Sequence, residues 1–331
     1  MKNLRETVGV DVSKSTIDVH LYVNNLHSTF ENNPKGFRAM LKLIKKCGIK
    51  ANEAFFCFEH TGMYSITLAA FLSEKNILFV MVPGLEIKRS IGMARGKDDK
   101  VDAKRIAEFA HMRRDKLEPT TLPSKEVLKI KHLLSLRERM VKQKAGYQAS
   151  VKGYKVALDP KDAKVLFDTQ AKLLSELKKQ IKKVEKEILD TIKSDETLSE
   201  LYELVTSVKG IGLVIGSYLL TTTNCFTAFD NARKYACYAG IAPFPYRSGS
   251  SIKGKTKVNH LANKTIKTLL IMAASTARQH DPELKQYYEK RLKEGKNEMS
   301  TLNVIKNKLI HRVFAVVKRK SPYVVLKKHA A

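Results

Sequence analysis

The order of apolar segments in the first third of the chain is the feature that most constrains its fold. Residues 7–23 contain TVGVDV and TIDVHLYV, which alternate or run apolar around a short turn at residues 13–15 and so predict two adjacent strands. STFENN offers a third strand. Helical and strand patterns then alternate, in the order helix 36–46, strand AFFCF, helix 64–75, strand ILFVMV and helix 100–113. An antiparallel set of strands followed by this alternation predicts a mixed sheet covered by helices.

The rest of the chain is predicted to be mostly helical, starting with residues 125–150. Apolar residues at the a and d spacing of a heptad repeat follow: Leu174, Leu177, Ile181, Val184 and Ile188. This seam fits a coiled coil between protomers or an amphipathic helix packed on its own domain. For 331 residues we predict an N-terminal domain at 1–120, a helical connector at 121–200 and a mostly helical domain at 201–331.

The charge of the chain points to a polyanionic partner. Lys and Arg number 61 against 33 Asp and Glu, which gives a net charge of +28. Such an excess favours nucleic acid, with an anionic membrane surface as the second candidate. No apolar run is long enough to span a bilayer and the first residues carry no apolar signal core, so we expect a cytoplasmic, nucleoid-associated protein. The cysteines form no C-x-x-C pair and the histidines no H-x-x-x-H pair, which argues against a zinc site.

Acidic residues accompany three of the predicted elements. Asp11 lies inside the apolar strand GVDVS, where an unpaired carboxylate is costly, and Glu59 ends the strand AFFCFE. Asp99 and Asp102 share one face of a helix, although the spacing also allows Asp98 with Asp102. Oxygen ligands of this kind suit Mg²⁺ and phosphoryl transfer. Each acid taken alone also fits a turn or helix-capping role.

The segment AGIAPFPYRSGSSIKGKTKV is predicted to be a loop that contacts phosphate. Ser248, Ser250 and Ser251 are candidate nucleophiles, but the residues alone slightly favour passive serines, since no activating base is close in the sequence. The basic residues that can bind phosphate here are Arg247, Lys253, Lys255 and Lys257.

A second glycine-bearing segment, VKGIG, is similar to the turn of a helix-hairpin-helix. In that motif the glycines, here Gly210 and Gly212, expose backbone N–H groups to a DNA phosphate at a helix N-terminus. An ordinary turn between two helices explains the segment equally well.

Taken together, GVDVSKSTIDV, FCFEHTG, GKDDKVDAKRIAEF, VKGIG and ARKYACYAGIAPFPYRSGSS resemble the transposases of the insertion-sequence 110 (IS 110) family, the DEDD type related to Piv invertases. The resemblance implies an α/β RNase H-like (RuvC-like) N-terminal domain, a coiled-coil connector and a C-terminal transposase domain. It places the family's DEDD set on Asp11, Glu59, Asp99 and Asp102, which selects Asp99 over Asp98, and the catalytic serine on Ser248.

The resemblance also implies an activity. The implied reaction is recombination of donor and target DNA through a phosphoserine intermediate, with two Mg²⁺ ions per site. The implied partners are a structured guide (bridge) RNA and further copies of the chain in a homodimer or homotetramer. Two rivals remain open at this point. A RuvC-like nuclease acting through metal-activated water needs the acids but no serine, and a non-enzymatic nucleic-acid-binding protein needs neither.

Overall fold

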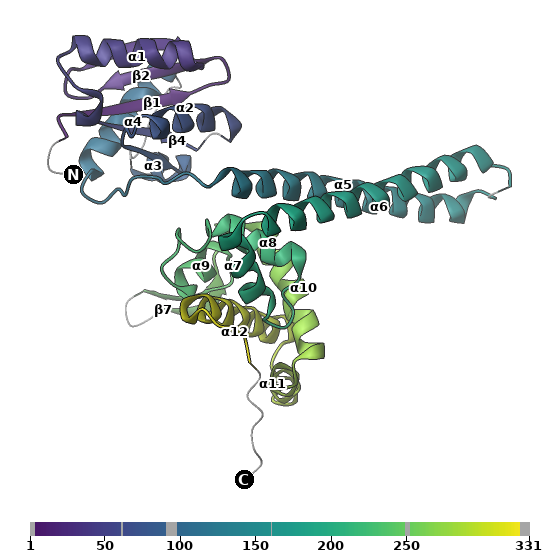
Figure 1. The fold of residues 1–331 in the computed structure, drawn as a ribbon. Helices are drawn as coiled ribbons and strands as arrows, with labels where there is room; N and C mark the ends of the chain where they lie inside the picture. Colours follow the sequence, from purple (N-terminus) through teal and green to yellow (C-terminus); the bar gives the residue numbers. More distant parts are fainter. Residues whose placement is uncertain (1–3, 61, 91–97, 160, 249–251, 325–331) are drawn as a thin grey trace. The chain divides into compact units, whose positions relative to one another are not determined.

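The computed structural model of the chain describes residues 4–60, 62–90, 98–159, 161–248 and 252–324. The chain folds into two compact units, Met1–Leu122 and Pro123–Ala331, which Figure 1 draws from purple to yellow along the sequence. Each unit has its own hydrophobic core, so each is described by itself. Whether residues 121–200 act as a separate connector stays a prediction.

A five-stranded mixed sheet forms the centre of the N-terminal unit, in the order β3-β2-β1-β4-β5. Strands β1, β2 and β3 are antiparallel neighbours, whereas β4 runs parallel to β1 and β5 runs parallel to β4. The strands are β1 (Glu6–Val12), β2 (Thr16–Leu21), β3 (Leu26–Glu31), β4 (Ala54–Glu59) and β5 (Phe79–Val82). This topology confirms the predicted mixed sheet and is compatible with an RNase H-like domain.

Helices cover both faces of this sheet because its central strands are apolar on both sides. On one face Val10 and Phe58 pack with the first two helices, and on the other Phe55 and Val80 pack with the third and fourth. The helices are α1 (Pro34–Lys46), α2 (Met63–Glu74), α3 (Gly84–Ser90) and α4 (Asp99–Arg113), with a short 3-10 turn η1 (Ala51–Glu53) before β4.

The C-terminal unit begins with two long helices, α5 (Lys125–Ala157) and α6 (Lys164–Lys193), which lie side by side (Figure 1). Within the described residues, six shorter helices build most of the rest of the unit around a core of aliphatic side chains and Tyr235. They are α7 (Glu196–Thr206), α8 (Leu213–Thr222), α9 (Ala232–Tyr238), α10 (Lys264–His280), α11 (Pro282–Lys293) and α12 (Glu298–Arg319).

The heptad seam of α6 is used within the chain over its C-terminal half. Ile188 is buried in a cluster with Ile130 and Leu134 of α5, and Val184 packs against the same cluster. Leu174 and Leu177, at the other end of the seam, are only half-buried. The intramolecular contact therefore accounts for part of the seam, and a contact between protomers stays a prediction for the remainder.

The predicted serine loop is instead a β-hairpin, so the expectation of an irregular loop was wrong. Strand β6 (Pro243–Ser248) pairs antiparallel with β7 (Ile252–Val258), with an irregularity in register between Phe244 and Tyr246. The two prolines in β6 interrupt the residue pattern that is typical of a strand. Proline is nevertheless tolerated in a strand with a free edge. A sheet of only two strands has such an edge on each strand.

Candidate functional site

Asp11 and Glu59 lie at the same edge of the N-terminal sheet. Strands β1 and β4 are parallel, with Val10 opposite Phe58, so the next residue of each strand is the acidic one. In the antiparallel direction Asp11 is paired with Asp18 of β2. The carboxyl ends of parallel strands are a common position for functional sites in α/β sheets. The sheet therefore gathers acids from three strands at one edge.

Helix α4 brings its acids to this edge by packing directly on β1. A Cβ atom on Gly9 of β1 would lie 2.2 Å from the backbone N of Ala107 and 2.3 Å from the carbonyl O of Ala103, so only glycine allows this approach. Toward the other end of the pair, the Thr7 hydroxyl lies 3.4 Å from His111 Nδ1. The helix thus runs antiparallel to β1, and its first turn, with Asp99 and Asp102, lies toward Asp11.

The charges of these acids act on one another. The pKa of Asp11 is raised from 3.8 to about 6, chiefly by burial and then by the negative charges of Asp99, Asp102, Glu59 and Asp18. Like charges raise a carboxyl pKa mainly at short range, so the contributions of these four acids agree with their position near Asp11. The structure thus brings together the four acids that the sequence singled out, and adds Asp18.

Three contacts define how individual acids are held. Asp98 caps α4 by accepting a hydrogen bond from the Lys100 N–H at 3.1 Å, which leaves Asp99 without the capping role. Asp102 forms an ion pair with Arg105 at 2.9 Å. Gly84 leaves room for Glu59, because a Cβ there would lie 2.5 Å from Glu59 Oε2.

The donor set suits a hard divalent cation, since it consists of carboxylates without nitrogen or sulfur. Within the described part of the chain, however, no three Asp, Glu, His or Cys side chains already surround one point as a metal would require. The residues fit Mg²⁺ in kind and in charge.

Comparison with known proteins places the chain in a family. A DEDD model of the IS110 type, described as "Transposase", matches residues 8–153, which span all four predicted acids. A second model, described as "Transposase IS116/IS110/IS902 family", matches residues 202–289, which include the hairpin. The chain belongs to the IS110 family of transposases.

Individual relatives agree with this assignment. The pilin gene-inverting protein of Moraxella bovis is 24% identical over 96% of this chain and 97% of its own length. Shorter matches include an IS110 protein of Streptomyces coelicolor, 30% identical over 36% of this chain and 29% of its own length. An IS116 protein of Streptomyces clavuligerus is 29% identical over 40% of this chain and 32% of its own length. This IS110 family member is a DNA transposase, and DNA is its substrate.

In this transposase Ser248 is the last residue of β6. Neighbouring Arg247 is exposed and lies opposite Lys253 in the hairpin register, while the exposed Lys257 lies opposite Phe244. Lys255 belongs to the same strand as these lysines. Ser250 and Ser251 lie outside the described residues. The strand register thus places Arg247 and Lys253 next to the pair formed by Ser248 and Ile252.

The glycine turn of the transposase connects α7 to α8. Gly210 has a φ of +94°, and a Cβ on it would lie 2.6 Å from the carbonyl O of Ala273 in α10, so this glycine is required for packing. Gly212 faces open space at the start of α8, whose first turn has no side-chain cap. A cavity of about 980 Å³ adjoins the turn, with Lys209, Lys264 and Arg137 in its lining.

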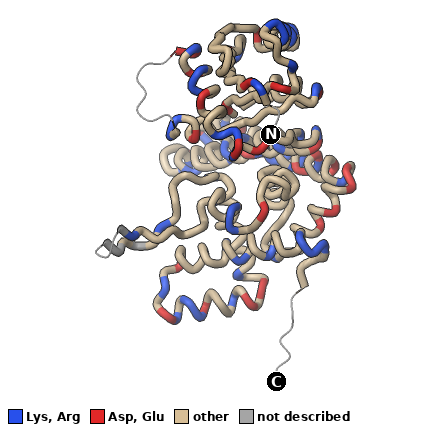
Figure 2. Tube along the Cα trace, turned by 90° about the vertical axis from the view of Figure 1, so that its left-hand side faces the viewer, with Lys and Arg blue, Asp and Glu red and all other residues tan. Residues whose placement is uncertain are grey.

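The positive charge of the transposase is spread widely. Lys and Arg, blue in Figure 2, occur along helices of both units and are interspersed with Asp and Glu. Within the described residues, no helix is both long and apolar enough to cross a bilayer.

The sequence analysis did not single out Gly9, Gly84 or Asp18. A signal for Asp18 exists, since a tight turn at residues 13–15 fixes the β1–β2 register and sets Asp18 opposite Asp11. Asp18 also accepts hydrogen bonds from Thr29 Oγ1 at 2.6 Å and from the His27 ring at 3.0 Å. These partners hold it in place, so it is less available as a ligand than Asp11.

Proposed function

We propose that this transposase cuts and rejoins DNA at a Mg²⁺ site made by Asp11, Glu59, Asp99 and Asp102. The observation that carries the proposal is the cluster itself, in which burial and then the charges of the other acids raise the pKa of Asp11 to about 6. Acids that repel one another at a sheet edge are stabilised when a divalent cation binds. Bound Mg²⁺ would stabilise charge on the scissile phosphate and favour ionisation of the attacking hydroxyl.

Ser248 is the proposed nucleophile. Its hydroxyl oxygen bonds to phosphorus while the bond from phosphorus to one DNA oxygen breaks, and the serine proton passes to that leaving oxygen. One phosphodiester replaces another, so a second DNA strand can later displace the serine without ATP. Arg247, the preceding residue, can hold a phosphate group through a bidentate contact to two of its oxygens. The acids and the serine belong to different units, so the reaction needs both.

Guidance by a bridge RNA and assembly into a dimer or tetramer belong to the same proposal. A net charge of +28 suits a protein that binds two kinds of nucleic acid. With an RNA guide, base pairing would determine which DNA sequence is bound, while the protein contacts the sugar-phosphate backbones of the RNA and DNA. The open N-terminus of α8 after Gly212 is the proposed helix-hairpin-helix contact to a DNA phosphate. The half-buried end of the α6 seam is the proposed coiled-coil contact between protomers.

Trapping a covalent protein–DNA adduct tests the proposed chemistry. The full chain is incubated with DNA carrying its element's end, with Mg²⁺ or EDTA, and separated on a denaturing gel. Wild type should give an Mg²⁺-dependent adduct that Ser248→Ala and Asp11→Asn both abolish. Cleavage without adduct in Ser248→Ala would instead identify a hydrolytic nuclease. No cleavage by wild type under any metal condition would contradict the metal site.

RNA guidance is tested by purifying the protein from cells that carry its native element and sequencing the RNA bound to it. We expect one discrete structured RNA encoded by the element. A mixture of unrelated cellular RNAs would contradict guidance and leave the adduct result unaffected.

A further inference from the structure

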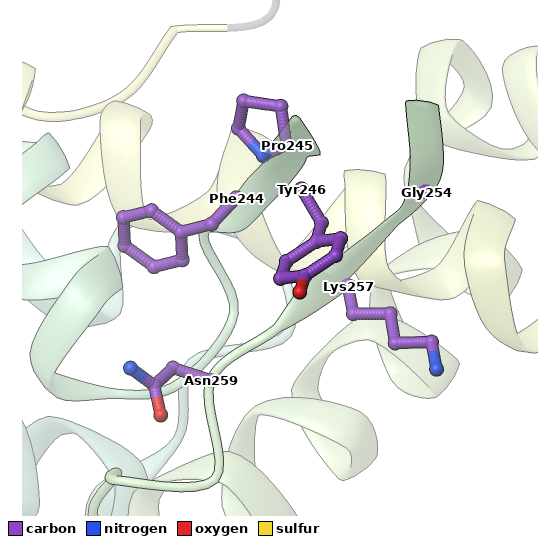
Figure 3. Close-up of a pocket in the computed structure, with 6 residues that line it drawn as sticks. All are labelled: Phe244, Pro245, Tyr246, Gly254, Lys257 and Asn259. Carbon is purple, nitrogen blue, oxygen red and sulfur yellow. The ribbon is translucent and has the colours of Figure 1, made fainter. Parts of the chain in front are cut away.

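Two aromatic side chains stand out on the hairpin because they are exposed. Phe244 is 45% exposed and Tyr246 is 65% exposed, and neither belongs to the core of the C-terminal unit. Both line a cavity of about 450 Å³, together with Pro245, Gly254, Lys257 and Asn259 (Figure 3). That volume falls within the usual range of ligand pockets, about 300–1,000 Å³.

The hairpin gains little stability from these two exposed rings. A two-stranded hairpin buries little apolar surface, so large aromatic residues on it contribute little to its stability. Exposed aromatic rings beside cations are instead characteristic of surfaces that bind single-stranded nucleic acid. DNA is already the substrate of this family, which supplies the partner of matching charge.

The position of the Tyr246 ring depends on the glycine across the hairpin. Gly254 is the register partner of Tyr246, and a Cβ on it would lie 2.6 Å from Cδ1 of the ring. The ring therefore lies over the backbone of β7 at a place that only glycine leaves open. Contact with the opposite strand limits the ring's freedom, which lowers the entropy cost of stacking a ligand on it.

Two polar groups complete the lining. In Figure 3 the side chain of Lys257 extends from the same hairpin as Tyr246. Its ammonium group can bind a phosphate. Asn259 uses Oδ1 to accept a hydrogen bond from the Leu261 N–H at 2.9 Å, and among the described residues its Nδ2 donates to no partner. That amide can donate to an acceptor on the edge of a base.

We infer that this cavity binds one unstacked nucleobase of a DNA strand, stacked on Tyr246 and in contact with Phe244, with Lys257 at an adjoining phosphate. Tyr246 and Ser248 are two residues apart on an extended strand, about 7 Å along β6. The bound base would belong to a nucleotide close to the phosphate that Ser248 attacks. Binding of this unstacked base would fix the position of the adjoining phosphate for attack. The inference rests on the proposed function only for this placement.

Tryptophan fluorescence gives a direct test because the chain contains no tryptophan. Tyr246→Trp, combined with Ser248→Ala and measured in EDTA, is titrated with an unlabelled single-stranded DNA oligonucleotide. We expect stacking of a base to quench the emission of this tryptophan at saturation. Tyr154→Trp, which replaces another exposed tyrosine, 40% exposed and on α5, is the control and should keep its emission.

Affinity provides the second readout, by fluorescence anisotropy with the same oligonucleotide in labelled form. Tyr246→Leu should weaken binding roughly 5- to 100-fold, whereas Tyr246→Phe, which keeps the ring, should bind like wild type. Tyr154→Leu should have no effect, and blunt duplex DNA should be bound equally by all variants.

Unquenched emission of the Tyr246→Trp protein at saturating DNA would overturn the inference, as would equal binding of the single strand by Tyr246→Leu and wild type. Weakened binding of RNA alone, with DNA unaffected, would overturn it too. Chemistry is blocked in every sample, so a failed phosphoserine mechanism leaves these outcomes unchanged. Conversely, loss of base stacking would not by itself remove the adduct described above.

Discussion

Two acids in strand β1 show how differently the fold treats a carboxylate. Glu6 is 2% exposed, and its oxygens accept hydrogen bonds from the N–H groups of Thr7 at 2.9 Å and Val23 at 2.8 Å, and from Asn24. Asp11, five residues later, accepts no hydrogen bond from the described residues, and the negative charges of Asp99, Asp102, Glu59 and Asp18 act on it. Hydrogen bonds within the folded chain satisfy the carboxylate of Glu6. The carboxylate oxygens of Asp11 are instead available to a ligand from outside the chain.

Replacement of Asp11 by Asn should stabilise the metal-free protein at pH 8. The folded-state pKa of about 6 lies above the ordinary value of 3.8, so the ionised side chain costs stability above pH 6, and the cost disappears as the pH falls below 3.8. Asp11 is partly exposed, and with solvent screening the gain should be about 1 kcal/mol. Thermal unfolding in EDTA at pH 8 and pH 4 measures it. A less stable variant at pH 8 would contradict the account.

A buried lysine in the C-terminal unit presents the opposite charge. Lys306 of α12 is 3% exposed, and within the described residues it forms no ion pair. Burial and then the neighbouring charge of Lys267 lower its pKa from 10.5 to about 8. A cation without a carboxylate partner in the interior destabilises the fold, in contrast to Arg312, which pairs with Asp281 at 2.7 Å.

Lys306→Met should therefore stabilise the protein at pH 7, by about 2 kcal/mol. Because the folded-state pKa is depressed, the cost of the charged lysine is present below pH 8 and fades as the pH rises toward 10.5. The gain should accordingly shrink at pH 10. Chemical denaturation at both pH values measures it, with Lys318→Met on the exposed face of α12 as control. Destabilisation at pH 7 would show that the ammonium group has a stabilising partner.

At the scale of elements, periodicity predicted the N-terminal unit well. Strands β1 to β5 and helices α1, α2 and α4 lie where their apolar patterns placed them, because alternation and helical spacing are local properties. The hairpin was missed because its residues lack alternation and include two prolines and two glycines. The packing of α4 on β1 was also beyond the sequence pattern, since it depends on Gly9 meeting a helix about 100 residues later in the chain.

Gly9→Ala should separate α4 from β1 and disturb the acidic cluster. The new Cβ would lie 2.2 Å from the Ala107 N, which is backbone and cannot rotate away. We expect a loss of about 1–3 kcal/mol, as for other overpacked sites, together with weaker Mg²⁺-dependent cleavage. Calorimetry and a cleavage assay measure the two effects. Gly146→Ala in α5, where a Cβ meets nothing within 4 Å, is the control and should be neutral or stabilising. A Gly9→Ala protein as stable as wild type would refute the close packing.

The outer part of the α6 seam gives a prediction about assembly. Leu174 and Leu177 are half-buried, so the double variant L174K/L177K should keep the melting temperature nearly unchanged. If these residues form a coiled coil between protomers, light scattering after size-exclusion chromatography should show dissociation to a smaller species. An unchanged molar mass would assign the whole seam to contacts within the chain.

At the scale of the whole molecule, composition predicts the kind of partner, whereas the fold determines which acids come together. A net charge of +28 predicts a nucleic-acid partner from residue counts alone, and the family assignment agrees. The family resemblance predicts that Asp11, Glu59, Asp99 and Asp102 cluster, whereas their spacing along the chain does not, because the cluster depends on strand register and on α4. Ser248 belongs to the other unit, so neither unit alone contains every residue that the proposed reaction uses.

Binding of Mn²⁺, a paramagnetic substitute for Mg²⁺, followed by electron paramagnetic resonance tests the acidic cluster most directly. Wild type should bind the ion, and Asp11→Asn, Glu59→Gln and Asp102→Asn should each weaken binding at least about tenfold. Glu108→Gln, on the same helix as Asp102, should bind like wild type. Equal affinity of wild type and all the cluster variants would contradict the claim that these acids form a metal site.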